Sequence, residues 1–399
     1  MRKLSLLAAA GLLAVAMTAK AESLDDILAS NGVLATSSAA PAKLSYADGV
    51  KIEAPDAGFD MKINLLIQAT ASYTDYENAS ERGLNDKTSF DIPRARLIFG
   101  GNLLNGEVSY FLQADFVGNQ NDATDDNTDD TGDTSELKDA WLRWNWNKDI
   151  GLQMGQFKVP FGRQELVNDH LLQFISRSQA SDDFTPGRDR GSMISGKTGD
   201  IGYALGVFNG QSDGENFNTA GVDPDLQGGG QVYFSSSNYG SRKSEGDYEQ
   251  TEGVGFTAGV SSDVMQGTND GDDFTLVEVA GDAGLRSEGL SLQAEYFWAS
   301  YDPDGGDNSN NTGYYAQAGY MVVPKEWEVA GRFSGVNPDS DGSPLGSNDQ
   351  YQYALAINRF YNGPNLKLTL QATFDQTDGN GEEEDTLDQV YEAQVSGYF

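Results

Sequence analysis

The sequence predicts an all-β protein, and within that class a transmembrane antiparallel β-barrel of about 16 strands. Three observations predict this fold. Most of the chain alternates apolar and polar residues with a period of two, as strands do when one side faces lipid and the other faces water. Tight turns and long polar segments follow one another between these stretches. The last stretch ends on an aromatic residue, Phe399, at the end of the chain.

Composition narrows the function. The chain has 399 residues, and 26 basic against 61 acidic residues give a net charge of −35. This excludes a nucleic-acid binder, because such a protein needs a basic face to neutralise phosphates. The absence of cysteine excludes disulfides, thiolate metal sites and thiol nucleophiles, and the single histidine, His170, excludes multi-histidine sites. We therefore expect no cofactor and no bound metal.

The N-terminus has the three parts of a secretory signal peptide. Arg2 and Lys3 precede an apolar run from Leu4 to Ala16, and Ala19 and Ala21 are small residues suited to cleavage. The run is too short for a membrane helix, which needs about 20 residues. No later run approaches that length, so the exported chain is either soluble or a β-barrel.

These features predict three segments along the chain. They are a signal peptide over 1–21, a flexible leader over 22–58 and a barrel domain over 59–399, within which 160–191 is a long loop.

Strand positions follow from the alternation. In the segment 364–376, for example, Leu366, Leu368 and Leu370 alternate with Lys367 and Thr369. The same reasoning predicts 16 strands, over 61–74, 88–101, 106–117, 136–147, 150–159, 192–198, 200–209, 229–236, 253–262, 273–284, 288–301, 312–324, 325–336, 348–361, 364–376 and 387–399. An even strand number with short turns on one side is typical of bacterial outer-membrane barrels.

Several short strings resemble the phosphate-selective porin O/P family. Residues 155–163 read Gly-Gln-Phe-Lys-Val-Pro-Phe-Gly-Arg, residues 187–191 read Gly-Arg-Asp-Arg-Gly, and residues 207–210 read Val-Phe-Asn-Gly. Pro93-Arg94-Ala95-Arg96-Leu97 and Asp139-Ala140-Trp141 add to the resemblance, which spans about residues 60–399. The resemblance implies a trimeric, 16-stranded outer-membrane channel whose third extracellular loop folds into the lumen.

The third long segment, 160–191, is the counterpart of that loop. It carries apolar side chains, among them Leu166, Leu171 and Phe174, that a freely solvated loop does not need. Long loops in compact proteins are commonly functional. We expect this loop to fold into the lumen and narrow the pore.

Strand parity and this loop select eight candidate constriction residues. Fixed cations in a water-filled narrowing favour anions, and fixed carboxylates favour cations. Parity points Arg94, Arg96 and Arg143 inward, and Lys158 shares the parity of Gln156. The full candidate set for the constriction and anion binding is Arg94, Arg96, Arg143, Lys158, Arg163, Arg177, Arg188 and Arg190, the last four in the loop. Each could equally pair with a lumen carboxylate and hold the loop in place.

Acidic loops oppose an anion preference and keep two alternatives open. Asp122 to Asp133 holds six aspartates, and Glu382 to Asp385 is wholly acidic. A general or cation-leaning porin is one alternative. A non-conducting structural or adhesive barrel with acidic loops that bind divalent cations is the other.

The leading interpretation is an outer-membrane porin for passive diffusion of small hydrophilic solutes, including anions such as phosphate. His170 lacks a positioned partner for acid–base chemistry, so an enzyme is not expected. Expected partners are outer-membrane lipid and lipopolysaccharide, two further copies in a homotrimer, small ionic or polar solutes, and the barrel-assembly machinery, which would recognise Phe399. No nucleic-acid partner is expected.

Overall fold

The computed structural model describes residues 42–46, 48–117, 136–210, 222–269, 272–339, 345, 347–379 and 385–399. The predicted signal peptide and most of the predicted leader lie outside these residues. The acidic stretches 122–133 and 382–384 lie outside them too.

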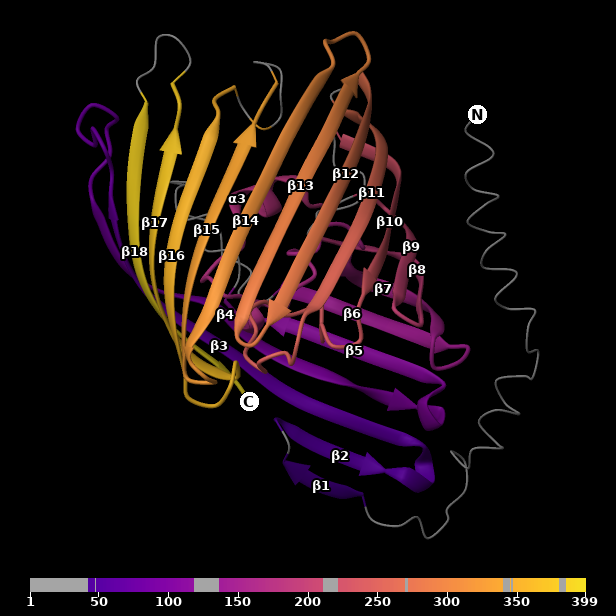
Figure 1. The fold of residues 1–399 in the computed structure, drawn as a ribbon. Coiled ribbons are helices and arrows are strands. Elements are labelled where there is room, and N and C mark those ends of the chain that lie inside the picture. The colour runs from indigo at the N-terminus through magenta and orange to yellow at the C-terminus, as the bar shows by residue number, and fades with distance from the viewer. Residues whose placement is uncertain are drawn as a thin grey trace, which may run out of the picture.

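Eighteen strands form one antiparallel sheet (Figure 1). Their bounds are β1 Lys43–Tyr46, β2 Val50–Ala54, β3 Phe59–Asp75, β4 Lys87–Leu103, β5 Val108–Asp115, β6 Glu136–Asn145, β7 Ile150–Lys158, β8 Arg188–Thr198, β9 Ile201–Phe208, β10 Val222–Ser235, β11 Gly255–Asn269, β12 Asp272–Ser287, β13 Leu290–Pro303, β14 Ser309–Val323, β15 Trp327–Asn337, β16 Gln350–Phe360, β17 Leu366–Thr377 and β18 Thr386–Tyr398. The helices within the described residues are short: η1 Pro55–Ala57, η2 Leu104–Gly106, η4 Asp169–Leu171 and α3 Gln179–Phe184.

Sixteen of these strands, β3 to β18, close into a barrel. Each pairs with the next along the chain, and β18 closes the ring against β3, with Tyr391 opposite Tyr73 and Gly397 opposite Ile67. At the end of this seam the backbone of Phe399 exchanges hydrogen bonds of 2.9 and 3.0 Å with Leu65. The predicted 16-stranded antiparallel barrel is therefore confirmed.

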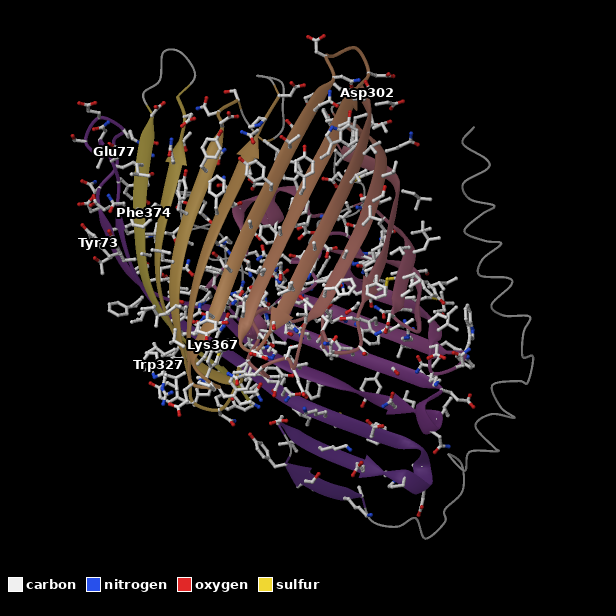
Figure 2. All side chains as sticks on the ribbon, in the orientation of Figure 1. Tyr73, Glu77, Asp302, Trp327, Lys367 and Phe374 are labelled. Atoms are coloured by element: carbon white, nitrogen blue, oxygen red, sulfur yellow. The ribbon has the colours of Figure 1, made fainter. Side chains whose placement is uncertain are left out.

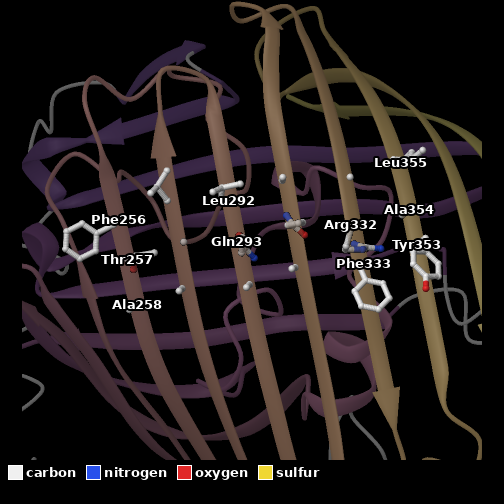
Figure 3. A pocket seen from close by; sticks show the side chains of 18 of the residues that line it. Phe256, Thr257, Ala258, Leu292, Gln293, Arg332, Phe333, Tyr353, Ala354 and Leu355 are labelled. Atoms are coloured by element: carbon white, nitrogen blue, oxygen red, sulfur yellow. The ribbon is translucent and has the colours of Figure 1, made fainter.

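Alternation separates the two faces of the barrel wall. Figure 3 shows a shallow apolar groove across β11 to β16, where Phe256, Leu292 and Tyr353 project from the outer surface. Neighbouring residues of opposite parity, such as Gln293 and Arg332, are buried on the inside. An apolar exterior and a polar interior are what a barrel in lipid requires.

The two ends of the barrel differ. Asp302 and Trp327 lie at opposite ends of the barrel (Figure 2), and the C-terminus lies at the Trp327 end (Figure 1). The Asp302 end carries long connections such as residues 76–86 and 159–187, whereas most connections at the Trp327 end are short, such as residues 288–289 and 324–326. Short turns mark the periplasmic end of outer-membrane barrels. None of the helices in the described ranges is long and apolar enough to cross a membrane.

The end of the predicted leader is not irregular. Residues 43–54 form the hairpin β1–β2, which pairs with β3 from Ala54 opposite Phe59 to Val50 opposite Ile63. β18 pairs with β3 only as far as Leu66. The backbone groups of β3 from Phe59 to Ile63 therefore need another partner, and β2 provides it. The sequence of this stretch has little alternation and therefore does not predict strands.

Several strand boundaries also differ from the prediction, and two of them show the reason. β8 begins at Arg188, opposite Lys158 of β7, so Arg188 and Arg190 lie on a strand rather than in the loop. β11 extends to Asn269 and pairs with β12 along its whole length. In both cases the backbone hydrogen bonds to the neighbouring strand continue past the residues that alternate between apolar and polar, so the strand is longer than the alternation predicts.

Candidate functional site

The loop between β7 and β8, residues 159–187 (called L3 below), is anchored by aromatic packing. Phe161 and Phe184 are at most 1% exposed, and both pack on Phe297 of β13, with ring centroids 6.4 and 5.7 Å apart. Burying each such side chain contributes about 1.5–3 kcal/mol. Phe297 has inward parity, so L3 rests against the inner wall of the barrel.

Local sequence explains the helix α3 within L3. Ser178 caps its N-terminus and accepts a hydrogen bond of 3.2 Å from the backbone N–H of Ser181. Asp182 adds a negative charge in the first turn, where the helix dipole favours it. Ala180 and Phe184 face β14, and a Cβ added at Gly313 would lie 2.5 Å from the Phe184 ring. Glycine at this position lets the helix approach the wall.

Polar contacts tie L3 to the wall at further strands. The backbone N–H of Ile175 donates to Gln371 of β17 at 2.8 Å, and that of Arg163 donates to Glu295 of β13 at 2.6 Å. Arg332 of β15 donates to the carbonyl of Ser176 at 2.9 Å. L3 is thus held to the inner wall across β13 to β17.

A charge network holds the other side of L3. Asp169 receives Arg177 at 3.0 Å, Arg94 at 3.5 Å and Arg96, which also binds Asp115 at 2.6 Å. Burial opposes ionisation of Asp169, but the guanidinium groups of Arg94, Arg177 and Arg96 outweigh it and hold the pKa of this carboxyl well below its usual value. The carboxylate stays charged at neutral pH.

A second carboxylate of L3 completes this network. Glu165 binds Lys158 and Arg177, each at 3.0 Å. Burial opposes ionisation here too, and the charges of Arg177 and Lys158 lower the pKa of Glu165. The network therefore joins L3 to β4, β5 and β7 through buried ion pairs.

An open cavity of about 670 Å³ lies between L3 and the wall formed by β3 to β10. Its charged lining comprises the six cations Arg96, Arg143, Lys158, Arg188, Lys197 and Lys243 and the three carboxylates Asp139, Asp149 and Asp169. The cavity lining is thus net cationic in a chain whose total charge is −35.

Three of the lining cations lack a carboxylate partner among the described residues. Arg143 donates to the carbonyl of Ser195 at 2.8 Å, to the Ser195 hydroxyl and to Asn145 at 3.1 Å. Lys197 and Lys243 are exposed to the cavity, and neither forms an ion pair within the described ranges. Their charged groups therefore face the cavity without a direct ion pair in the described part of the chain.

The eight predicted candidates therefore separate into groups. Four of them line the cavity: Arg96, Arg143, Lys158 and Arg188. Arg94 and Arg177 join the network around Asp169. Arg163 is 2% exposed and binds Tyr239, remote from the cavity lining. Arg190 donates to Gln156 at 3.1 Å.

Sequence reasoning missed Lys197 and Lys243. Lys197 shares the inward parity of Met193 and Ser195, so the alternation of β8 could have found it. Lys243 belongs to residues 236–254, between β10 and β11, which have no periodicity. The only available signal was the length of this segment at an end where the other connections are short.

His170 is a structural residue of L3. Its ring stacks on Tyr398 of β18, with centroids 4.1 Å apart and planes 4° from parallel. Burial, and then the charge of Lys367, lower the pKa of His170 to about 4. It is therefore neutral at physiological pH. Within the described ranges, no group of three or more His, Asp or Glu side chains is arranged to hold a metal ion.

Solved structures of outer-membrane channels share this architecture. The anion-selective porin from Comamonas acidovorans is 12% identical with a TM-score of 0.58, and the match covers 84% of this chain and 99% of that one. The channel DcaP of Acinetobacter baumannii is 15% identical with a TM-score of 0.57, covering 85% and 98%. OmpT of Vibrio cholerae is 8% identical with a TM-score of 0.56, covering 89% and 100%. At such identities the likeness establishes the fold.

Sequence comparison gives the family. A protein of Aquifex aeolicus (strain VF5) described as uncharacterized is 22% identical over 290 residues, 66% of this chain and 68% of that protein. The sequence profile described as "Phosphate-selective porin O and P" matches residues 63–396, nearly the whole barrel. The chain therefore belongs to the phosphate-selective porin O and P family and is an outer-membrane β-barrel channel.

Proposed function

We propose that this channel prefers small hydrophilic anions, such as phosphate, and that they diffuse passively through the cavity between L3 and the wall of β3 to β10. The main support for this proposal is the net positive charge of the cavity lining. Six cations face three carboxylates there, although the chain as a whole is strongly acidic. Fixed cations at a narrow, water-filled passage raise the local concentration of anions and lower that of cations.

The unpaired cations carry the preference in this proposal. Arg143, Lys197 and Lys243 line the cavity and form no ion pair with a carboxylate in the described ranges. The eight predicted cations remain the proposed constriction set, with a division of roles. Arg96, Arg143, Lys158 and Arg188 face the solute, whereas Arg94, Arg163, Arg177 and Arg190 position L3 and the adjoining strands.

A cation-leaning general porin is the second candidate. It is favoured by Asp139, Asp149 and Asp169 in the same lining and by the net charge of −35. Acidic charge outside the cavity acts on ions over about 8 Å at physiological salt, whereas the lining cations act at contact. This difference in range favours the anion preference.

Assembly and export follow the family expectation. We propose a homotrimer in the outer membrane, in contact with lipid and lipopolysaccharide, that is exported through a signal peptide over 1–21. The aromatic end residue Phe399, which is 44% exposed beside the closing seam, is the proposed contact for the barrel-assembly machinery.

Neutralising the three unpaired cations tests the proposal. In planar bilayers under a KCl gradient, we expect Arg143→Gln, Lys197→Gln and Lys243→Gln combined to lower the chloride-to-potassium permeability ratio about threefold or more. The matched control combines Lys51→Gln, Lys325→Gln and Arg359→Gln, which removes the same charge at sites outside the cavity. Equal shifts in both variants would assign selectivity to net charge and reject the proposed site.

A further inference from the structure

The connection between β10 and β11, residues 236–254 (called the inner turn below), differs from the others at its end of the barrel. Neighbouring connections there are as short as residues 288–289 and 324–326. The inner turn is also largely shielded from solvent at its centre. Tyr239 is 1% exposed, Asp247 3% and Glu245 8%, although a turn at the rim of a barrel is normally solvated.

The inner turn is bonded directly to L3. The backbone N–H of Asn168 donates to the carbonyl of Lys243 at 3.3 Å, and the N–H of Glu245 donates to the carbonyl of Leu171 at 3.0 Å. The Glu245 carboxylate accepts from the backbone N–H of Gln173 and from the side chain of Gln164, each at 2.8 Å. Two connections from opposite ends of the barrel therefore meet in the lumen as one hydrogen-bonded body.

Cation–π contacts fix the base of the inner turn. Tyr239 lies under the guanidinium groups of Arg286, at 4.5 Å, and Arg163, at 5.4 Å. Arg286 also donates to the carbonyl of Tyr239 at 2.9 Å. Arg163 belongs to L3 and Arg286 to β12, so Tyr239 joins both to the turn.

This arrangement places Lys243 in the cavity. The lysine lies beside the Asn168 contact, lines the cavity together with Asn168, Arg188 and Tyr233, and is itself exposed. The protein walls around the lumen partly desolvate the Lys243 ammonium and lower its pKa, while the carboxylate of Asp139 raises it and Arg143 lowers it. Asp139 and Arg143 belong to β6, so the inner turn reaches toward the opposite wall of the cavity.

We propose that the inner turn is the second half of the constriction and that Lys243 is a specificity-determining residue that attracts small oxyanions there. This inference rests on the proposed anion preference for the sign of the effect, but the place of Lys243 in the permeation path stands independently of it. L3 and the inner turn together close the lumen along β11 to β17 and leave the path beside β3 to β10.

The absence of cysteine in the chain allows a direct test. The variant Lys243→Cys is treated with two methanethiosulfonates, one that attaches a sulfonatoethyl group and one that attaches a trimethylammonioethyl group. Mass spectrometry measures the labelled fraction, and planar bilayers measure conductance and reversal potential. The two attached groups have similar length and opposite charge, so a comparison between them tests the sign of the charge at position 243.

We expect the anionic label to reduce the chloride-to-potassium permeability ratio about twofold or more, and the cationic label to restore the wild-type ratio. The matched control is Lys325→Cys on the turn 324–326, whose side chain is half-exposed and outside the cavity lining. Labelling there should leave both measurements unchanged. The wild-type channel should not respond to either reagent.

The outcomes separate this inference from the proposed function. Full labelling of Lys243→Cys without any change in conductance or reversal potential would overturn the inference, as would failure of the folded protein to be labelled. A cation-selective wild type whose labelled Lys243→Cys variant still changes conductance would reject the anion preference but keep the inner turn in the constriction.

Discussion

At the scale of single residues, Asp169 forms the largest group of ion pairs that hold L3. Its carboxylate is shared by Arg94, Arg96 and Arg177, which come from β4 and from L3 itself. A buried ion pair adds little net stability by comparison with a well-packed apolar pair. Removing one partner is strongly destabilising, because the remaining buried charges are then left without an opposite charge.

We predict that Asp169→Asn destabilises the docking of L3 by about 3–5 kcal/mol. Limited proteolysis of the detergent-solubilised barrel measures this as faster cleavage within residues 159–187. The matched control is Glu249→Gln, whose carboxylate binds Lys325 on the surface, where its side chain is 80% exposed, and it should cost less than about 1 kcal/mol. Equal cleavage of Asp169→Asn and wild type would contradict the role given to Asp169.

The same residue predicts a pH dependence. The pKa of Asp169 in the folded protein lies below that of an unfolded aspartate, about 3.9. Its stabilisation is therefore fully present above about pH 4 and is lost as the pH falls through the lower folded-state pKa. The contribution of Asp169 to the protection of L3 should therefore be constant from neutral pH to about 5. His170, whose pKa is lowered to about 4 in the folded protein, adds a separate loss that begins as the pH falls below about 6.5, the value of an unfolded histidine. In His170→Gln that early loss should disappear, and a loss that remained between about pH 6.5 and 5 would contradict the assignment.

At the scale of elements, L3 stays in the lumen through the packing of α3 as well as through charge. Phe184 of α3 is 1% exposed and stacks on Phe297 over an apolar patch of the inner wall. Charge and packing hold opposite sides of the loop, since the Asp169 network contacts β4, β5 and β7 whereas α3 contacts β13 to β15.

We predict that Phe184→Ala costs about 3–5 kcal/mol of L3 docking, because a large buried ring leaves a cavity behind. Single-channel recordings should then show a larger and noisier conductance, as the loop leaves the wall. Phe90→Ala is the control, since Phe90 is 85% exposed and removing it leaves no cavity. An unchanged conductance in Phe184→Ala would show that the packing of Phe184 is not needed to hold L3 against the wall.

Elements could be predicted from the sequence wherever alternation is strong. All 16 barrel strands were predictable because lipid imposes an apolar outer face on every strand. The hairpin β1–β2 was not, since only the unpaired edge of β3 makes it a strand. The inner turn was not either, because its polar residues enter the lumen through hydrogen bonds to L3 that no periodic pattern encodes.

The same limit applies to the site. The alternation of the strands predicts that Arg96 and Arg143 point toward the lumen, and both line the cavity there. It could not distinguish Arg96, bound to Asp115 and Asp169, from Arg143, which has no carboxylate partner in the described ranges. Pairing depends on which carboxylates the folded loop brings near, so the sequence leaves that distinction open.

At the scale of the whole molecule, the chain combines a net charge of −35 with a cationic cavity lining. These two sets of charges act over different distances. Salt screens the acidic charges outside the cavity beyond about 8 Å, whereas a passing ion touches the cationic lining directly. The proposed function therefore places the control of selectivity at the passage between L3, the inner turn and the wall of β3 to β10.

The reversal potential of the purified wild-type channel in a planar bilayer under a KCl gradient tests this account most directly. We expect the sign of an anion-selective channel, together with a decrease in chloride current when inorganic phosphate is added. A reversal potential of the opposite sign, unaffected by phosphate, would show that the acidic exterior governs permeation and would contradict the role given to the cationic cavity.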